Sequence, residues 1–170
     1  MKISFSRSWI LTALALAIVL AAVPGAIQRL IETRDAYLFT RHFFQDLLAR
    51  LSGPGRMRFI LQPALAVFFG TRDGVKDARA GNPPFLSGLL FHKTHRMNLL
   101  KSALESVRNL VAIAIILDVA SQLIIFREVH PGAALLLGPV LISAPYSLSR
   151  ATANRVAREN ARHAPARRSS

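Results

Sequence analysis

The sequence contains no cysteine and few acidic residues. Without cysteine, the chain has no disulfide and no thiolate ligand for zinc, an iron–sulfur cluster or thioether-linked haem. Only 9 Asp and Glu residues stand against 22 Lys and Arg residues, which gives a net charge of +13. The sequence also lacks a phosphate-binding loop, a nucleophile elbow and a metalloprotease helix. We therefore expect a non-enzymatic protein without a cofactor.

Apolar residues, in contrast, are abundant and gathered into long blocks. They make up 52% of the 170 residues. Two runs, 107–126 and 129–148, are each about 20 residues long, enough for a helix to cross roughly 30 Å of hydrocarbon. Because only a few polar residues join them, they predict an antiparallel transmembrane hairpin over residues 107–149. The predicted fold class is all-α and integral to a membrane.

Residues 1–27 form another apolar block, with Lys2 and Arg7 ahead of the run 9–27. This pattern is typical of a membrane anchor or of a cleaved signal peptide. A signal peptide needs small residues three and one positions before the cleavage site, and the nearest candidates place a leucine or a proline at the first of these. We favour a retained anchor helix, which Pro24 and Gly25 would kink or end.

Residues 28–106 are basic throughout and predict an interfacial region of amphipathic helices. The pattern over 28–51 favours a helix in the membrane interface or against another part of the protein. The apolar segment 59–70 would reach only about 18 Å as a helix, so we predict a re-entrant or interfacial segment and leave a crossing open. Residues 73–84 predict a turn-rich connection, and 94–106 a helix that continues into the hairpin.

Basic residues flank the hairpin unevenly, which predicts a topology. Arg127 is the one basic residue in the turn, whereas the basic tail, 150–170, holds six arginines. The positive-inside rule therefore places the turn outside and both ends of the hairpin, with the C-terminus, in the cytoplasm. Three spans, with 28–106 also cytoplasmic, satisfy the rule except at the N-terminus, whereas four spans would place a basic loop outside.

Asp118 lies inside the first hairpin run, with Gln122 one turn later and Ser121 on an adjoining face. An ionisable residue at this depth is costly, so it is a functional hypothesis by default. No basic residue lies within two turns of Asp118 on its own helix, so we expect a buried, protonated carboxyl. The polar group would hold helices together, belong to a proton or ion pathway, or contact a lipid. Asn should be tolerated in the first case.

The second hairpin run is rich in small residues and proline, which allow helices to approach closely. The residues expected at such contacts are Gly132, Gly138, Pro139 and Pro145. The residues expected as anchors at the membrane interface are Tyr146, Arg150 and Arg108.

His92 and His95 have a spacing that can chelate a metal from one helix face. No third ligand follows at a recognised offset, and Lys93 and Arg96 repel a cation. We therefore interpret the pair as a solvated loop and helix start, and we predict no metal site.

A series of short motifs runs from about residue 56 to residue 158. They are Gly70-Thr71-Arg72-Asp73-Gly74, Asp77-Ala78-Arg79-Ala80-Gly81, Pro83-Pro84-Phe85, Leu117-Asp118 with Gln122, Pro131-Gly132 with Ala134, and Pro145-Tyr146 with Arg150, Asn154 and Arg155. In these motifs the chain resembles small bacterial inner-membrane proteins that lack an assigned activity. The resemblance supports a membrane hairpin and implies no function.

Two functional hypotheses follow. The first is an accessory or assembly component that binds anionic lipid headgroups, a membrane-protein partner or a second copy of itself. Basic residues near an anionic membrane surface each gain about 1 kcal/mol, which favours lipid over nucleic acid as the partner. The second is a subunit of an oligomeric transport or proton-conducting assembly that uses Asp118, with several copies because three spans cannot enclose a pathway.

Overall fold

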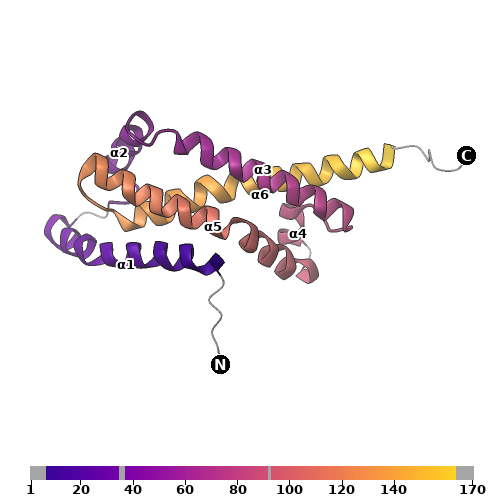
Figure 1. Ribbon diagram of the computed structural model, residues 1–170, viewed down its shortest axis with the longest axis horizontal. Coiled ribbons are helices and arrows are strands. Elements are labelled where there is room, and N and C mark those ends of the chain that lie inside the picture. Colours follow the sequence, from indigo (N-terminus) through magenta and orange to yellow (C-terminus); the bar gives the residue numbers. More distant parts are fainter. Residues whose placement is uncertain (1–6, 35–36, 92, 164–170) are drawn as a thin grey trace, which may run out of the picture. The chain divides into compact units, whose positions relative to one another are not determined.

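The computed structural model describes residues 7–34, 37–91 and 93–163. These residues form six α-helices and no strand, which confirms the predicted all-α class for this part of the chain (Figure 1). The helices are α1 (Arg7–Thr33), α2 (Arg41–Ser52), α3 (Arg58–Arg79), α4 (Phe85–Phe91), α5 (Lys93–Phe126) and α6 (Pro131–His163).

The chain divides into two compact units. Unit 1 comprises Met1–Gln62 and Arg108–Ile142, and unit 2 comprises Pro63–Val107 and Ser143–Ser170. Helices α3, α5 and α6 each contribute residues to both units.

Three helices are long and apolar enough to cross a membrane, judged by length and composition. These stretches are Trp9–Thr33 in α1, Arg96–Phe126 in α5 and Pro131–His163 in α6. Many of their large apolar side chains face outward instead of into the protein. Examples are Leu14, Leu16, Leu20, Ile27 and Ile31 on α1, Leu117, Leu123 and Ile124 on α5, and Leu135, Val140 and Leu148 on α6.

In unit 1, small residues let α1, α5 and α6 pack together. Ala15 and Val19 of α1 share a buried cluster with Ala112 of α5 and Ala134 of α6. Gly138 of α6 faces α5 so closely that an added Cβ would lie 3.0 Å from the backbone nitrogen of Ile115. The two helices that form the predicted hairpin therefore lie against each other in this unit.

Helices α1 and α5 run in the same direction in unit 1. Near the N-terminal end of α1 and the middle of α5, the Arg108 guanidinium lies 4.2 Å from the centre of the Trp9 ring. Near their C-terminal ends, Arg29 Nη1 lies 2.6 Å from Glu128 Oε2. The residues that follow α1 thus lie beside the α5–α6 turn. In unit 1, the end of α1 and the α5–α6 turn therefore lie at the same end of the helices.

The segment 28–51 is not a single helix, contrary to the prediction. Helix α1 continues through Pro24 to Thr33, although an internal proline removes a backbone hydrogen bond of the helix. The chain then turns, with positive φ angles of 56° at Arg34 and 64° at Phe39. Thr40 begins α2, and its hydroxyl accepts a hydrogen bond from the Phe43 backbone N–H at 3.3 Å.

Helix α3 extends beyond the predicted apolar segment 59–70 and includes much of the predicted turn-rich connection 73–84. Gly70 and Gly74, one helical turn apart, bring α3 against the backbone of α6 in unit 2. An added Cβ on Gly70 would contact Ser149 Oγ and lie 2.5 Å from the Tyr146 carbonyl oxygen, and one on Gly74 would contact the Arg150 carbonyl oxygen. The glycines serve helix packing here and do not form a turn.

Candidate functional site

The most polar part of unit 1 is centred on Asp118 of α5. Arg58, at the start of α3, places Nη2 2.6 Å from Asp118 Oδ1. Arg50 of α2 places Nη1 3.5 Å from Asp118 Oδ2. Arg50 and Asp118 are each only 1% exposed, so two guanidinium groups share one carboxylate away from solvent. We call Arg50, Arg58 and Asp118 the arginine–aspartate cluster.

Gln122 extends this cluster to the α5–α6 turn. Its amide nitrogen donates a hydrogen bond to Asp118 Oδ2 at 2.7 Å, and its amide oxygen accepts one from the His130 backbone N–H at 2.6 Å. Ser121, predicted beside them, donates to the Leu117 carbonyl oxygen on its own helix instead. Of the three predicted polar residues, the structure joins Asp118 and Gln122 directly.

The structure places two basic partners at Asp118 that the sequence did not indicate. The sequence-based view considered only the residues of α5, whereas Arg50 and Arg58 come from two other helices. A guanidinium group and a carboxyl group 2.6 Å apart form a short, charge-assisted contact. Asp118 therefore connects α5 to α2 and α3.

Unit 2 contains a second buried polar group, on α3 and α6. The Tyr146 hydroxyl donates to Asp73 Oδ2 at 2.9 Å, and Arg150 Nε donates to Asp77 Oδ2 at 2.7 Å. Arg150 Nη1 also donates to the Tyr146 hydroxyl oxygen at 2.9 Å. Its guanidinium group lies 4.7 Å from the centre of the Phe85 ring. We call Asp73, Asp77, Tyr146 and Arg150 the tyrosine–arginine cluster.

Two of the three expected interfacial anchors thus differ from the prediction. Tyr146 and Arg150 are buried within unit 2, because Asp73 and Asp77 of α3 supply polar partners that their own helix lacks. Arg108, in contrast, lies over the Trp9 ring, and Trp9 is 52% exposed. An arginine on a largely exposed tryptophan is typical of an interfacial position.

The predicted helix-packing residues of α6 have different surroundings. Gly138 meets α5, and an added Cβ on Gly132 would lie 2.9 Å from Leu38 Cδ1. Pro139 and Pro145 are half-buried, and α6 continues through both of them to His163.

The histidine pair remains outside what the structure can test. His92 lies outside the described residues, and His95 is placed only as a helical residue of α5. Among the described residues, no group of three or more histidine and acidic side chains is arranged to hold a metal ion.

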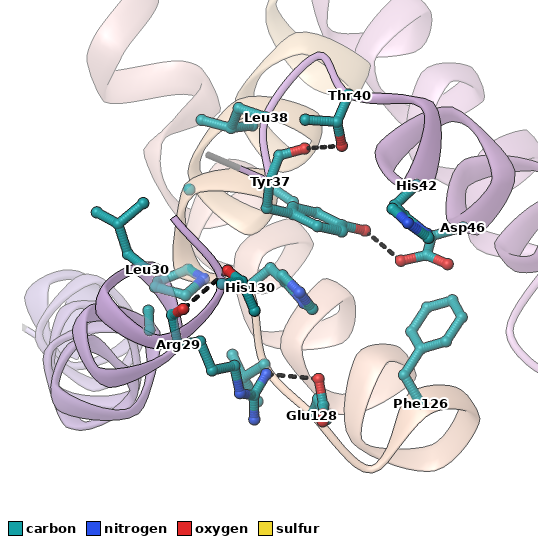
Figure 2. A pocket seen from close by; sticks show the side chains of 16 residues that line it. Arg29, Leu30, Tyr37, Leu38, Thr40, His42, Asp46, Phe126, Glu128 and His130 are labelled. Carbon is teal, nitrogen blue, oxygen red and sulfur yellow. Dashed lines mark hydrogen bonds and ion pairs between the residues drawn. The ribbon is translucent and has the colours of Figure 1, made fainter. Parts of the chain in front are cut away.

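A pocket of about 650 Å³ opens in unit 1 where α1 ends and α6 begins (Figure 2). Its polar walls hold Tyr37 and His130, whose ring centres are 3.6 Å apart. The Tyr37 hydroxyl donates to Asp46 Oδ2 at 2.6 Å and accepts from Arg50 Nη2 at 3.2 Å. The pocket wall is therefore connected by hydrogen bonds to the arginine–aspartate cluster.

The surroundings of the two rings keep both of them uncharged at neutral pH. Burial, followed by the hydrogen bond to Asp46, raises the pKa of the Tyr37 phenol above its usual value. Burial, followed by the positive charge of Arg29, lowers the pKa of the His130 imidazole. Tyr37 thus remains a hydrogen-bond donor, and His130 contributes a neutral ring to the pocket.

Sequence reasoning missed the partners that define both clusters. Arg50 and Arg58 gave no signal beyond general basicity, because their distance from Asp118 along the chain hides the contact. For α3, the spacing Gly70-xxx-Gly74 was a usable signal, since small residues four apart allow close helix approach. Asp73 and Asp77 have the same spacing and lie on the same helix.

Comparison of this chain with protein-family models, with curated proteins and with solved structures finds no match in any of the three.

Proposed function

We propose that this chain is a multi-pass protein of the bacterial inner membrane that binds membrane lipids and catalyses no reaction. The observation that carries the proposal is how polar and apolar groups are distributed. The buried charged groups of each unit are paired with one another, whereas large apolar side chains of α1, α5 and α6 face outward. A lipid environment suits this arrangement, because in water the outward-facing side chains would form an unusually large exposed apolar surface.

The common direction of α1 and α5 implies a return crossing between them. If both helices cross the membrane in the same direction, the chain must come back an odd number of times. Helix α3, with 22 residues, is about 33 Å long, whereas α2 has 12 residues and α4 has 7. Helix α3 is not one of the three helices that qualify as membrane spans by length and composition. We nevertheless assign the return to α3, because its buried Asp73 and Asp77 are paired with residues of α6, which lowers the cost of placing them in a membrane.

The positive-inside rule then orients this four-crossing arrangement. The last turns of α6 are rich in arginine and would be cytoplasmic, together with the start of α1. The loop between α1 and α3 would be periplasmic although it is basic. Its charge is reduced because Arg50 and Arg58 are buried with Asp118, and Arg29 is paired with Glu128.

The C-terminal end of α6 provides a site for anionic headgroups. With 33 residues, α6 is about 50 Å long and exceeds the roughly 30 Å of hydrocarbon in a bilayer. A hollow of about 510 Å³ in unit 2 is lined by Arg79, Arg158 and Arg162, and its other lining residues are uncharged. Guanidinium groups match phosphate in both charge and geometry, so this hollow suits a phosphodiester headgroup.

The pairing of Asp118 separates this proposal from a transport function. A carboxylate that carries protons or ions along a pathway must exchange its partners with water. Asp118 instead neutralises Arg58 and Arg50 and is almost completely shielded. This supports a structural role for the buried charge.

Lipid titration of the purified protein tests the proposal. We would compare phosphatidylglycerol with phosphatidylcholine by native mass spectrometry, and expect the anionic lipid to bind more tightly. Changing Arg79, Arg158 and Arg162 together to Gln should weaken phosphatidylglycerol binding by about tenfold or more, at about 1 kcal/mol per arginine. The matched control changes exposed Arg34, Arg41 and Arg56 to Gln, with the same loss of charge. Equal effects of the two triple variants would contradict the proposal.

A further inference from the structure

We propose that the 650 Å³ pocket of unit 1 binds a phospholipid with an amine-bearing headgroup, with the amine at Asp46 and Glu128. This inference extends the proposed function to a second lipid class and rests on the protein lying in a membrane. It is carried by the charge of the pocket wall, by its apolar floor and by the hydrogen bonds that fix its polar groups (Figure 2).

The charge of the wall is opposite to that of the protein as a whole. The chain has 22 basic and 9 acidic residues, yet the pocket is lined by two carboxylates, Asp46 and Glu128, and by one arginine, Arg29. The His130 ring adds no positive charge, because its environment favours the neutral form. A ligand with an ammonium group is therefore favoured here over a purely anionic ligand.

The carboxylates are available for a ligand. Asp46 uses Oδ2 for the Tyr37 hydroxyl, which leaves Oδ1 on the same group for a further donor. Glu128 is paired with Arg29, but the two side chains are 48% and 37% exposed. Ion pairs this exposed are worth about 0–1 kcal/mol, so a zwitterionic headgroup can replace the pair at little cost. Its ammonium would face Glu128 and its phosphate would face Arg29.

The remaining lining residues suit the apolar part of a lipid. They are mostly apolar: Ala26, Leu30, Leu38, Phe126, Val129, Pro131, Gly132 and Ala133, with Thr33, Thr40 and His42 among the polar ones. Ala26 and Leu30 belong to α1, a candidate membrane span, and Leu30 is also largely exposed. An acyl chain can therefore continue from the pocket along the outer surface of α1.

The polar side of the pocket is held in place by the arginine–aspartate cluster. Arg50 donates to the Tyr37 hydroxyl, which in turn donates to Asp46. On the other wall, the His130 backbone N–H is bound by Gln122, which also donates to Asp118. Positions fixed before binding lose little entropy when the ligand arrives, which favours a specific site over a general lipid-facing surface.

Short-chain lipid titration by native mass spectrometry tests this inference. We would add dioctanoyl phosphatidylethanolamine or phosphatidylglycerol to the delipidated protein. In the wild type, we expect phosphatidylethanolamine to occupy one site that Asp46→Asn weakens by about tenfold, the effect of one charge-assisted hydrogen bond. The control Glu105→Gln removes an exposed carboxylate of α5 that lines neither hollow and should change nothing. Leu30→Trp, which fills the pocket and keeps its charges, should also weaken the site.

The outcomes separate this inference from the proposed function. An equal effect of Asp46→Asn and Glu105→Gln, or no effect of Leu30→Trp, would overturn the pocket. Glycerophosphoethanolamine without acyl chains, if it bound as tightly as the lipid, would overturn the lipid assignment. If the wild type binds phosphatidylglycerol at Arg79, Arg158 and Arg162 but does not bind phosphatidylethanolamine in the pocket, the inference alone is rejected. If the wild type binds phosphatidylethanolamine in the pocket but not phosphatidylglycerol at the three arginines, the proposed headgroup hollow is rejected.

Discussion

Unit 1 buries one carboxylate between two guanidinium groups, whereas unit 2 buries one guanidinium group between two carboxylates. In unit 1, Asp118 contacts Arg50 and Arg58. In unit 2, Arg150 contacts Asp77 directly and reaches Asp73 through the Tyr146 hydroxyl. The first cluster has two basic groups around one acidic group, and the second has two acidic groups around one basic group.

We expect the central residue of each cluster to matter more for stability than either of its partners. Removing the centre leaves two like charges buried without the counter-ion that they share. Removing one partner leaves a one-to-one ion pair, which a shielded site tolerates far better.

Asp118→Asn should have the largest effect. It leaves Arg50 and Arg58 buried without a carboxylate, a loss of about 3–5 kcal/mol of stability. Chemical unfolding of the purified protein in detergent measures this loss, and we expect low abundance in membranes as well. The sequence alone predicted the opposite, because the two arginines were not visible from α5. Stability equal to wild type would show that the cluster does not need its charge.

Arg150→Met should have a comparable effect in unit 2, because it leaves Asp77 without its cation and Asp73 with only the exposed Lys76, 3.8 Å away. We expect a loss of about 3–5 kcal/mol by the same measurement. Arg150→Lys keeps the charge but loses the forked contacts, so its stability should lie between those of Met and wild type. A Lys variant as unstable as Met would mean that geometry, not charge, dominates in this cluster.

Arg58→Gln should be milder than Asp118→Asn, although both remove the same 2.6 Å contact. It leaves the neutral pair Arg50–Asp118, and we expect a loss of about 2 kcal/mol, the value of one charged hydrogen bond. Adding Arg58→Gln to Asp118→Asn should recover part of the stability that the Asn change alone removes. Additive losses in the double variant would contradict the charge argument.

Gly70→Ala should destabilise unit 2 by about 1–3 kcal/mol, because the new methyl group meets Ser149 and the backbone of Tyr146. Gly25→Ala is the matched control. It also replaces a helical glycine, but an added Cβ there has nothing within 4 Å. In thermal unfolding measured in detergent, Gly70→Ala should therefore have a lower Tm than the wild type, and Gly25→Ala should not. Equal Tm values for the two variants would contradict the close α3–α6 contact.

Much of the helical framework could be predicted from the sequence, because long apolar runs specify helices directly. The run 107–126 falls within α5, the run 9–27 falls within α1, and the run 129–148 falls within α6 from Pro131 onward. The ends were harder to place: Thr40 begins a new helix inside 28–51, and α3 extends well beyond residue 70. The site was only partly predictable. Asp118 stood out by its depth, but its counter-ions come from other helices, so the sequence could not indicate its charge.

His130 should give the smallest effect and a pH dependence. Its pKa is lowered in the folded state, so below the usual pKa near 6.5 the unfolded state binds more protons. The stability contribution of the neutral ring is present above this pH and decreases as pH falls toward the folded pKa. The Tm of the wild type should decrease between pH 7.5 and pH 5.5. In His130→Gln this decrease should be smaller, by at most about 3 °C. His163→Gln, at an exposed site on α6, is the control.

Labelling of single cysteines tests the central claim, a membrane protein in which α3 crosses together with α1, α5 and α6. The chain has no native cysteine, so each introduced thiol reports its own position. Cysteines replacing Phe39 and Glu128 should react with an impermeant maleimide on intact cells. Cysteines replacing Lys76 and Arg162 should react only after permeabilisation. Phe39 and Glu128 on opposite sides of the membrane, or Phe39 and Lys76 on the same side, would contradict the account.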